Sequence, residues 1–436
     1  MGSSYEVDYK KCVKMDNNGK KIGLALSGGG YRAAAYHVGT LRALHKLGIL
    51  ENVDVISSVS GGSIIAAFYG LHKDDGYDAF ETVFMQKIQK GVLHITIINT
   101  ILFILMWLIL IWGLKWIGGI LGLVLFLLFQ YQLLPLSRWI SLQYDRLFFN
   151  NATLDKLPDQ PSVKICSTDV ATGRLFVFSK EELYGYDYRH NGIHFNTQFF
   201  PISMAVMASS CVPFAFSPIT IPESFFIDSK RVKEGPLLID GGLYDNQGAY
   251  KLQEKGSDYE CSNIIVSDAG NSEMSKKWVV NTMFLLIKTS EILMRRIRAM
   301  QIQQNIFSTD KTHKFAYTSL LWNPQVNWLE KFAYNIKNGN VHQCVLEYHQ
   351  IGIDLINHLK QRETWELGLV ELQDCLIKSI DWENLLKKRP DIQVWVQAKS
   401  VGTSLVGLNK HQINALIHCA EWMTELQIKT YLPNLL

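Results

Sequence analysis

The sequence has few of the features that mark several common classes of protein. Its 436 residues carry a formal net charge of only +3 and contain no basic run, so we expect no nucleic-acid partner. The polar residues 1–20 contain no apolar core, and we therefore expect no secretory signal. Seven cysteines are scattered without a Cys-x-x-Cys pair, which favours a reducing compartment and predicts no zinc site (Cys12, Cys166, Cys211, Cys261, Cys344, Cys375 and Cys419). Composition does not predict an oligomeric state.

Charged residues are almost absent from one long segment. Between Gly91 and Ser137 the only charged residue is Lys115, and an apolar run lies on each side of it. About 20 apolar residues suffice for a helix to cross a hydrocarbon core of roughly 30 Å. The glycines within 113–119 are suited to turn the chain between the two runs. We therefore predict that residues 92–136 form a transmembrane or membrane-embedded helical hairpin.

Cations flank both ends of this segment. The positive-inside rule then predicts that the rest of the chain lies on the cytosolic side of the membrane (Lys87, Lys90, Arg138 and Arg146). Polar residues inside the segment leave two alternatives open, because Thr96, Asn99 and Gln130 interrupt the apolar pattern. One alternative is an interfacial or re-entrant hairpin, and the other is a helical pair buried in the core.

Strand-like and helix-like segments alternate in the remaining sequence. Apolar runs over 21–26 and 53–59 predict buried strands, and each is followed by a helical pattern. This order favours a mainly parallel sheet with helices on both faces. We predict one α/β domain composed of residues 21–91 and 138–436. A long amphipathic helix is expected over 275–306, packed on the core.

Three glycines at 28–30 follow the first predicted strand and open a helix. Backbone N–H groups at such a turn attract negative charge. A P-loop is excluded because no Gly-Lys-Ser/Thr follows. A dinucleotide-binding turn fits the glycine spacing, since Ala33 stands at the third position of that pattern. That fold also needs an acidic residue at the end of the second strand. The acidic residue at about the right separation, Asp54, lies instead at the start of that strand.

Ser60 stands between the second buried strand and two glycines, in the sequence SVSGG at 58–62. A serine there is often a helix N-cap. It can also be a nucleophile on a sharp strand-to-helix turn, for which the G-x-S-x-G elbow is typical, although Ser58 replaces the first glycine here. Since the carboxyl ends of adjacent parallel strands lie together, the 28–30 amides would then face an oxyanion formed at Ser60.

A serine nucleophile needs a base, and two aspartates end predicted strands. Asp240 follows the apolar run at 236–239 and precedes two glycines, whereas Asp268 ends the apolar run at 263–267. No histidine follows a clear strand, which disfavours a Ser-His-Asp triad. Either aspartate can instead be a simple turn residue.

The stretches SGGGYR (27–32), SVSGG (58–62) and DGGLYDN (240–246) together resemble the patatin-like phospholipases. TDVATGRLFVF (168–178), MASSCVPFAFSPI (207–219) and IIVSDAG (264–270) are also similar to that family, as is the segment 403–423. The resemblance covers most of the chain except the hairpin. Ala33 departs from the family pattern, which usually has glycine there.

The resemblance implies a three-layer α/β/α sandwich and a Ser-Asp dyad that hydrolyses acyl esters without a cofactor. Carried over to this sequence, Ser60 is the nucleophile and Asp240 the base, and the oxyanion loop comprises Gly28, Gly29, Gly30 and Arg32. The expected substrate is a membrane phospholipid, cleaved by a membrane-anchored phospholipase A. A neutral-lipid or lysophospholipid hydrolase and an inactive lipid-binding protein are the alternatives.

Overall fold

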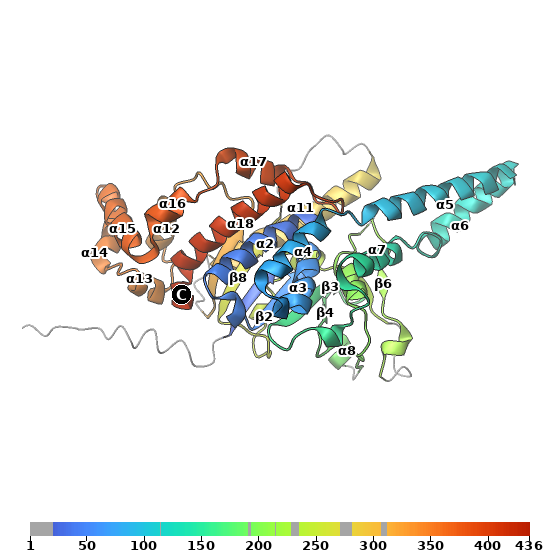
Figure 1. Cartoon of the computed structure of the whole chain (residues 1–436), viewed down its shortest axis with the longest axis horizontal. Coiled ribbons are helices and arrows are strands. Elements are labelled where there is room, and N and C mark those ends of the chain that lie inside the picture. Colours follow the sequence, from blue (N-terminus) through green and yellow to red (C-terminus); the bar gives the residue numbers. More distant parts are fainter. Residues whose placement is uncertain are drawn as a thin grey trace, which may run out of the picture.

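The computed structural model describes residues 21–113, 115–190, 193–213, 215–227, 235–270, 281–306 and 312–436. The predicted polar segment 1–20 and the start of the helix expected over 275–306 lie outside these ranges. Figure 1 shows a sheet covered by helices on both faces, with further C-terminal helices at one end and a helical hairpin projecting from the other.

The described residues form a nine-stranded sheet in the order β5-β4-β3-β2-β1-β8-β9, with β7 paired to β3 and β6 paired to β7. The pairs β1–β2, β1–β8, β2–β3 and β8–β9 are parallel, and the pairs that involve β4, β5, β6 and β7 are antiparallel. The predicted mainly parallel sheet is therefore confirmed. Its strands are β1 (Ile22–Leu26), β2 (Val55–Val59), β3 (Ser162–Asp169), β4 (Leu175–Phe178), β5 (Leu183–Gly185), β6 (Ile219–Thr220), β7 (Leu237–Asp240), β8 (Asn263–Asp268) and β9 (Lys314–Ser319).

Alternate residues of β1 belong to different hydrophobic clusters, because successive side chains of a strand point to opposite faces. Leu24 and Leu26 pack in the larger cluster, whereas Ala25 packs in a smaller one on the other face. The larger cluster includes residues of α2 (Gly30–Lys46), α3 (Gly61–His72), α4 (Tyr77–Ile88), α7 (Leu136–Tyr144), α9 (Ile202–Ser209) and α18 (Lys410–Tyr431). On the other face, α11 (Thr282–Ile306) contributes Ile302. Two short helices, α8 (Tyr186–His190) and α10 (Gly242–Asp245), lie in the connections.

The C-terminal helices pack around a separate cluster of aromatic and aliphatic residues. That cluster includes Trp328, Leu372 and Trp382, and α18 joins it through Trp422 and Leu426. The helix α18 therefore connects the sheet domain to this helical part. The helices concerned are α12 (Trp328–Lys337), α13 (Gln343–Tyr348), α14 (Ile353–Lys360), α15 (Trp365–Ile380) and α16 (Trp382–Lys387). The helix α17 (Ile392–Ser400) packs instead on the larger cluster, through Ala398.

The long apolar segment forms a helical hairpin of α5 (Leu93–Gly113) and α6 (Lys115–Leu133) (Figure 1). Within the described ranges, no helix is both long enough and apolar enough to cross a membrane. This finding corrects the predicted transmembrane hairpin. Non-helical dihedral angles at Phe129 interrupt α6, so its regular part spans about 20 Å, which is short of a hydrocarbon core. The first turns of α5 pack on the domain, where Thr96 is only 4% exposed.

Candidate active site

The strands β2 and β7 run toward each other along one edge of β3. In the parallel pair β2–β3, Val59 lies opposite Cys166, whereas in the antiparallel pair β3–β7, Asp240 lies opposite Ser167. The other edge of this part of β3 is occupied by β4, so β2 and β7 share an edge and their carboxyl ends meet. Ser60 and Asp240 are therefore neighbours. The sequence placed Asp240 at the end of a predicted strand without indicating the direction of that strand, and β7 runs antiparallel to β3.

Ser60 occupies a backbone conformation that residues other than glycine rarely adopt. Its φ is 50° and its ψ is −117°, at the turn from β2 into α3. Its side chain makes no cap hydrogen bond to α3, so the N-cap interpretation is not realised. The hydroxyl instead lies close enough to the carboxylate of Asp240 to favour its ionised form. A strained backbone at such a strand-to-helix turn is typical of a functional site, because it exposes the serine hydroxyl at the top of the turn.

Asp240 is almost fully buried, with 6% of its surface exposed. The Gly242 amide donates to its Oδ1 at 2.7 Å, and the Ser60 hydroxyl lies nearby. Both groups favour the ionised carboxylate, but burial has the larger effect and raises the pKa of Asp240 from an ordinary 3.8 to about 7. The carboxyl group therefore exchanges its proton near neutral pH, as a general base requires.

Asp268, the rival base, has different partners. Its Oδ2 pairs with Arg298 Nε at 2.5 Å and accepts a hydrogen bond from the Tyr317 hydroxyl, and its Oδ1 accepts from the Gly270 amide at 2.8 Å. Among the described residues, no contact of Asp268 with Ser60 is found. Asp268 therefore forms part of a buried ion pair, whereas Asp240 contacts the candidate nucleophile.

The glycine loop packs directly against the Ser60 turn. A Cβ atom on Gly28 would lie 3.3 Å from Ser60 Cβ, and one on Gly61 would collide with the carbonyl oxygen of Gly30. Gly30 itself has a φ of 60°, and a Cβ there would lie 2.5 Å from the Ser404 carbonyl oxygen. Glycine is thus required at these positions because two backbones approach each other closely.

The loop amides are not equivalent as donors. Gly28 N–H already donates to the Asn246 carbonyl oxygen at 2.9 Å. For the N–H groups of Gly29 and Gly30, no acceptor is found in the part of the chain that the structure describes. Gly28 therefore provides room beside Ser60, while Gly29 and Gly30 provide the amides that are available to an oxyanion.

Arg32 lies beneath the loop and not at its mouth. Only 2% of its surface is exposed, and it donates to the carbonyl oxygens of Ala269 at 3.0 Å and Val401 at 3.3 Å. Burial lowers the pKa of Arg32 to about 10, so the guanidinium stays charged at neutral pH. Arg32 therefore holds the loop against two other segments.

Two residues that sequence reasoning left unassigned support the site. Ser209 Oγ accepts from the Ser60 amide at 2.8 Å and donates to the Cys166 carbonyl oxygen at 2.6 Å, which fixes the turn to β3. Asn246 connects the glycine loop to the segment after β7 through its bond from Gly28. Both lie in stretches noted in the sequence, MASSC and DGGLYDN. Their polar side chains within these family-like stretches could have marked them as candidate site residues. Among the described residues, no group of three or more potential metal ligands occurs.

Comparisons with known proteins identify the family. The family model described as patatin-like phospholipase matches residues 24–250, just over half of the chain. A patatin-like phospholipase domain-containing protein of Caenorhabditis elegans is 51% identical over 57 residues, and a lysophospholipase of Pyricularia oryzae is 43% identical over 56 residues. Each match covers 13% of this chain and only 4% of the relative.

Among solved structures, the crystal structure of VipD from Legionella pneumophila aligns with a TM-score of 0.29 and 13% identity. The alignment covers 93% of this chain and 91% of that one. With the family model covering both Ser60 and Asp240, the chain belongs to the patatin-like phospholipase family.

Proposed function

We propose that this chain is a serine acyl hydrolase that cleaves fatty-acyl esters of phospholipids, with Ser60 as the nucleophile and Asp240 as the general base. Membership of the patatin-like phospholipases suggests lipid acyl hydrolysis. The observation that carries the finer proposal is the meeting of β2 and β7 on β3, which places the Ser60 hydroxyl beside a buried carboxylate whose pKa is about 7. A serine hydroxyl is inert at neutral pH unless such a base accepts its proton.

In the proposed reaction, Ser60 Oγ attacks the ester carbonyl carbon and its proton passes to Asp240. The N–H groups of Gly29 and Gly30 receive the oxyanion, and α2 adds its positive dipole end. When the intermediate collapses, the alcohol leaves with the proton from Asp240 and an acyl-serine remains. Water then attacks that ester and gives a proton to Asp240, and when this second intermediate collapses the fatty acid is released and Asp240 returns the proton to Ser60 Oγ.

The test is hydrolysis of a fluorogenic short-chain ester by the wild type, Ser60→Ala and Asp240→Asn. We expect both variants to lose at least about a thousandfold in kcat, since the nucleophile and its base act as one unit. Asp268→Ser and Arg298→Ser are unsuitable controls because they break a buried ion pair. An exposed site such as Gly402→Ala provides the control, because nothing lies within 4 Å of a Cβ there. Activity that survives Ser60→Ala would refute the mechanism.

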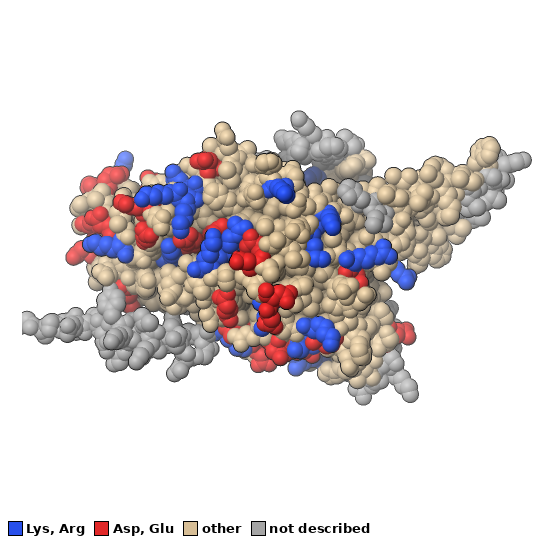
Figure 2. Space-filling model, viewed as in Figure 1, with Lys and Arg blue, Asp and Glu red and all other residues tan. Residues whose placement is uncertain are grey.

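We also propose that the hairpin docks the domain on the surface of a lipid bilayer. Its side chains are apolar and exposed: Trp112 is 87% exposed, Ile109 70% and Leu128 69%. In Figure 2 the described atoms of the hairpin carry no charged residues, while lysines and arginines lie near its base. Exposed Arg138 and Arg146 follow α6 and are suited to anionic headgroups.

The base of the hairpin lies close to the glycine loop. Tyr31, the residue after Gly30, donates its hydroxyl to the Lys90 carbonyl oxygen at 3.4 Å, and Val92 N–H donates to the Leu405 carbonyl oxygen at 3.2 Å. Docking through the hairpin would therefore bring the entrance of the site near the lipid that it cleaves. The cytosolic location predicted from flanking charge assumed a spanning hairpin and stays a prediction.

Vesicle co-sedimentation tests the docking proposal. The paired change Ile109→Glu and Trp112→Glu should abolish binding to vesicles of phosphatidylcholine and phosphatidylserine, because charge on this apolar face opposes burial in lipid. Ile353→Glu is the matched control, since Ile353 is 76% exposed on α14. Unchanged binding of the hairpin variant would refute docking by this surface without bearing on the dyad.

A lysophospholipid substrate is the second candidate. The observation in its favour is the 43% identity to the Pyricularia oryzae lysophospholipase over 56 residues. Turnover of lysophosphatidylcholine, diacyl phosphatidylcholine and triacylglycerol by one preparation separates the candidates. Preference for the diacyl lipid supports the leading proposal, and preference for the lysolipid supports the second.

A further inference from the structure

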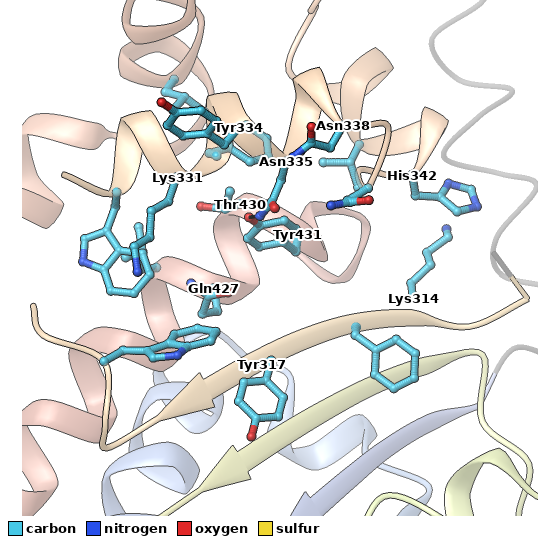
Figure 3. A pocket seen from close by; sticks show the side chains of 18 of the residues that line it. Lys314, Tyr317, Lys331, Tyr334, Asn335, Asn338, His342, Gln427, Thr430 and Tyr431 are labelled. Carbon is cyan, nitrogen blue, oxygen red and sulfur yellow. Dashed lines mark hydrogen bonds between the residues drawn. The ribbon is translucent and has the colours of Figure 1, made fainter. Parts of the chain in front are cut away.

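A cavity of about 510 Å³ lies outside the residues that the family model matches. It is bounded by β9, α12 and the C-terminal half of α18, with contributions from α13, α15 and α16 (Figure 3). Its volume is within the range of about 300–1,000 Å³ that holds small-molecule ligands in proteins. None of the residues proposed for catalysis lines it.

The body of the cavity is aromatic and aliphatic. Trp322 and Trp328 lie side by side in its wall, with ring centroids 5.5 Å apart, and Leu376 and Leu426 add aliphatic surface. Trp328 Nε1 is buried, and no hydrogen-bond partner for it is found among the described residues.

Two lysines are among the polar residues that line the cavity, Lys314 and Lys331. Lys331 Nζ lies 5.1 Å from the ring centroid of Trp328. At the other end, Figure 3 shows Lys314 pointing from β9 toward the side of the cavity where His342 lies. None of the described residues that line the cavity is acidic.

We propose that this cavity is a binding site for an amphiphilic anion, with a carboxylate or phosphate head beside Lys331 and an acyl chain along the aromatic and aliphatic wall. The cationic donors match the head, and the tryptophan and leucine side chains match the chain. The choice of a lipid anion rests on the proposed function, because ester hydrolysis of a phospholipid yields a fatty-acid anion and a lysophospholipid. Each of these products has the required head and tail.

Hydrogen bonds connect the wall of the cavity to the glycine loop. The ring of Tyr317 forms part of the wall, and its hydroxyl accepts from Gln247 Nε2 at 2.7 Å and donates to Asp268. Gln247 follows Asn246, whose carbonyl oxygen accepts from Gly28 N–H. A ligand in the cavity would therefore contact a residue that is two hydrogen bonds from the candidate active site.

Tryptophan quenching tests the site in the full chain carrying Ser60→Ala, so that no probe is hydrolysed. Three of the 11 tryptophans line the cavity, Trp322, Trp328 and Trp382. The probes are a brominated fatty acid, a brominated lysophosphatidic acid and a brominated monoacylglycerol, each below its micelle-forming concentration. We expect saturable quenching by at least one of the two anions and not by the neutral lipid.

Charge reversal locates the bound probe. Lys331→Glu should weaken anion binding by about tenfold, because a like charge then faces the head group. Lys337→Glu is the matched control on the same helix, since Lys337 does not line the cavity. Quenching by the fatty acid alone, or by the phosphate lipid alone, identifies the source of the anion and supports the proposal. Equal quenching by the neutral lipid, no saturable quenching, or equal loss in both lysine variants would overturn it. Because the assay needs no turnover, it can succeed or fail independently of the dyad.

Discussion

Asp240→Asn should abolish ester hydrolysis and yet stabilise the fold above pH 7. In the native protein burial raises the pKa of Asp240 from 3.8 to about 7. Between these values the folded state binds a proton that the unfolded state does not, so the free energy of unfolding falls as pH rises. This contribution is fully present below pH 3.8 and is lost once pH passes about 7.

The magnitude follows from the difference between the two pKa values. A difference of about 3 corresponds to about 4 kcal/mol at most. Asparagine has no charge to bury, and its Oδ1 can still accept from the Gly242 amide. The variant should therefore match the wild type in stability near pH 4 and exceed it by up to about 4 kcal/mol at pH 8.

Urea unfolding of both proteins from pH 5 to 8.5 measures this difference, and other titrating groups cancel in the comparison. Asp268→Asn is the matched control at the end of another strand. It removes the partner of buried Arg298, so it should destabilise the fold by about 3–5 kcal/mol. A stability difference for Asp240→Asn that does not grow with pH, or a loss of stability at pH 8, would refute the assigned burial and pKa.

Three further measurements, one pH profile and two substitutions, test the same geometry. In the wild type, kcat/KM for a soluble ester should rise with pH through an apparent pKa of about 7, since only ionised Asp240 can accept the Ser60 proton; a flat pH–rate profile would contradict this. Ser209→Ala should lower the free energy of unfolding by about 1–3 kcal/mol in urea titrations and reduce kcat, because the Ser60 amide loses its acceptor. Gly61→Ala should abolish turnover in the ester assay, because its Cβ collides with the Gly30 carbonyl oxygen, and wild-type activity in this variant would disprove the close approach.

The parallel part of the sheet could be predicted because its strands are continuous apolar runs. The expected strands at 21–26 and 53–59 correspond closely to β1 and β2, and both are buried on two faces. The candidate pair Ser60 and Asp240 could be found because each stands at a strand end before two glycines. The direction in which a strand pairs has no comparable sequence pattern. The antiparallel pairing of β7 could therefore not be predicted from its four residues.

The hairpin illustrates a different limit. Composition correctly indicated two apolar helices joined by a turn, because apolar content depends only on residue identity. It did not indicate the interruption at Phe129, since a local change in φ and ψ has no compositional signature there. Nor did it indicate that Thr96 packs against the domain, which shortens the exposed part of α5.

The two strand-end aspartates explain why the direction of β7 matters for chemistry. Asp268 ends a parallel strand and forms a buried ion pair with Arg298. Asp240 ends an antiparallel strand that pairs with β3 just beyond the carboxyl end of β2, and it is therefore buried beside the backbone of β3, where Gly242 donates to it and the Ser60 hydroxyl lies nearby. Burial without a cation raises its pKa to about 7. An aspartate with an ordinary pKa would be too weak a base for a serine hydroxyl. In the proposed reaction Asp240 therefore acts as the base, the role that histidine has in a triad, because the position of β7 buries its carboxyl group and raises its pKa.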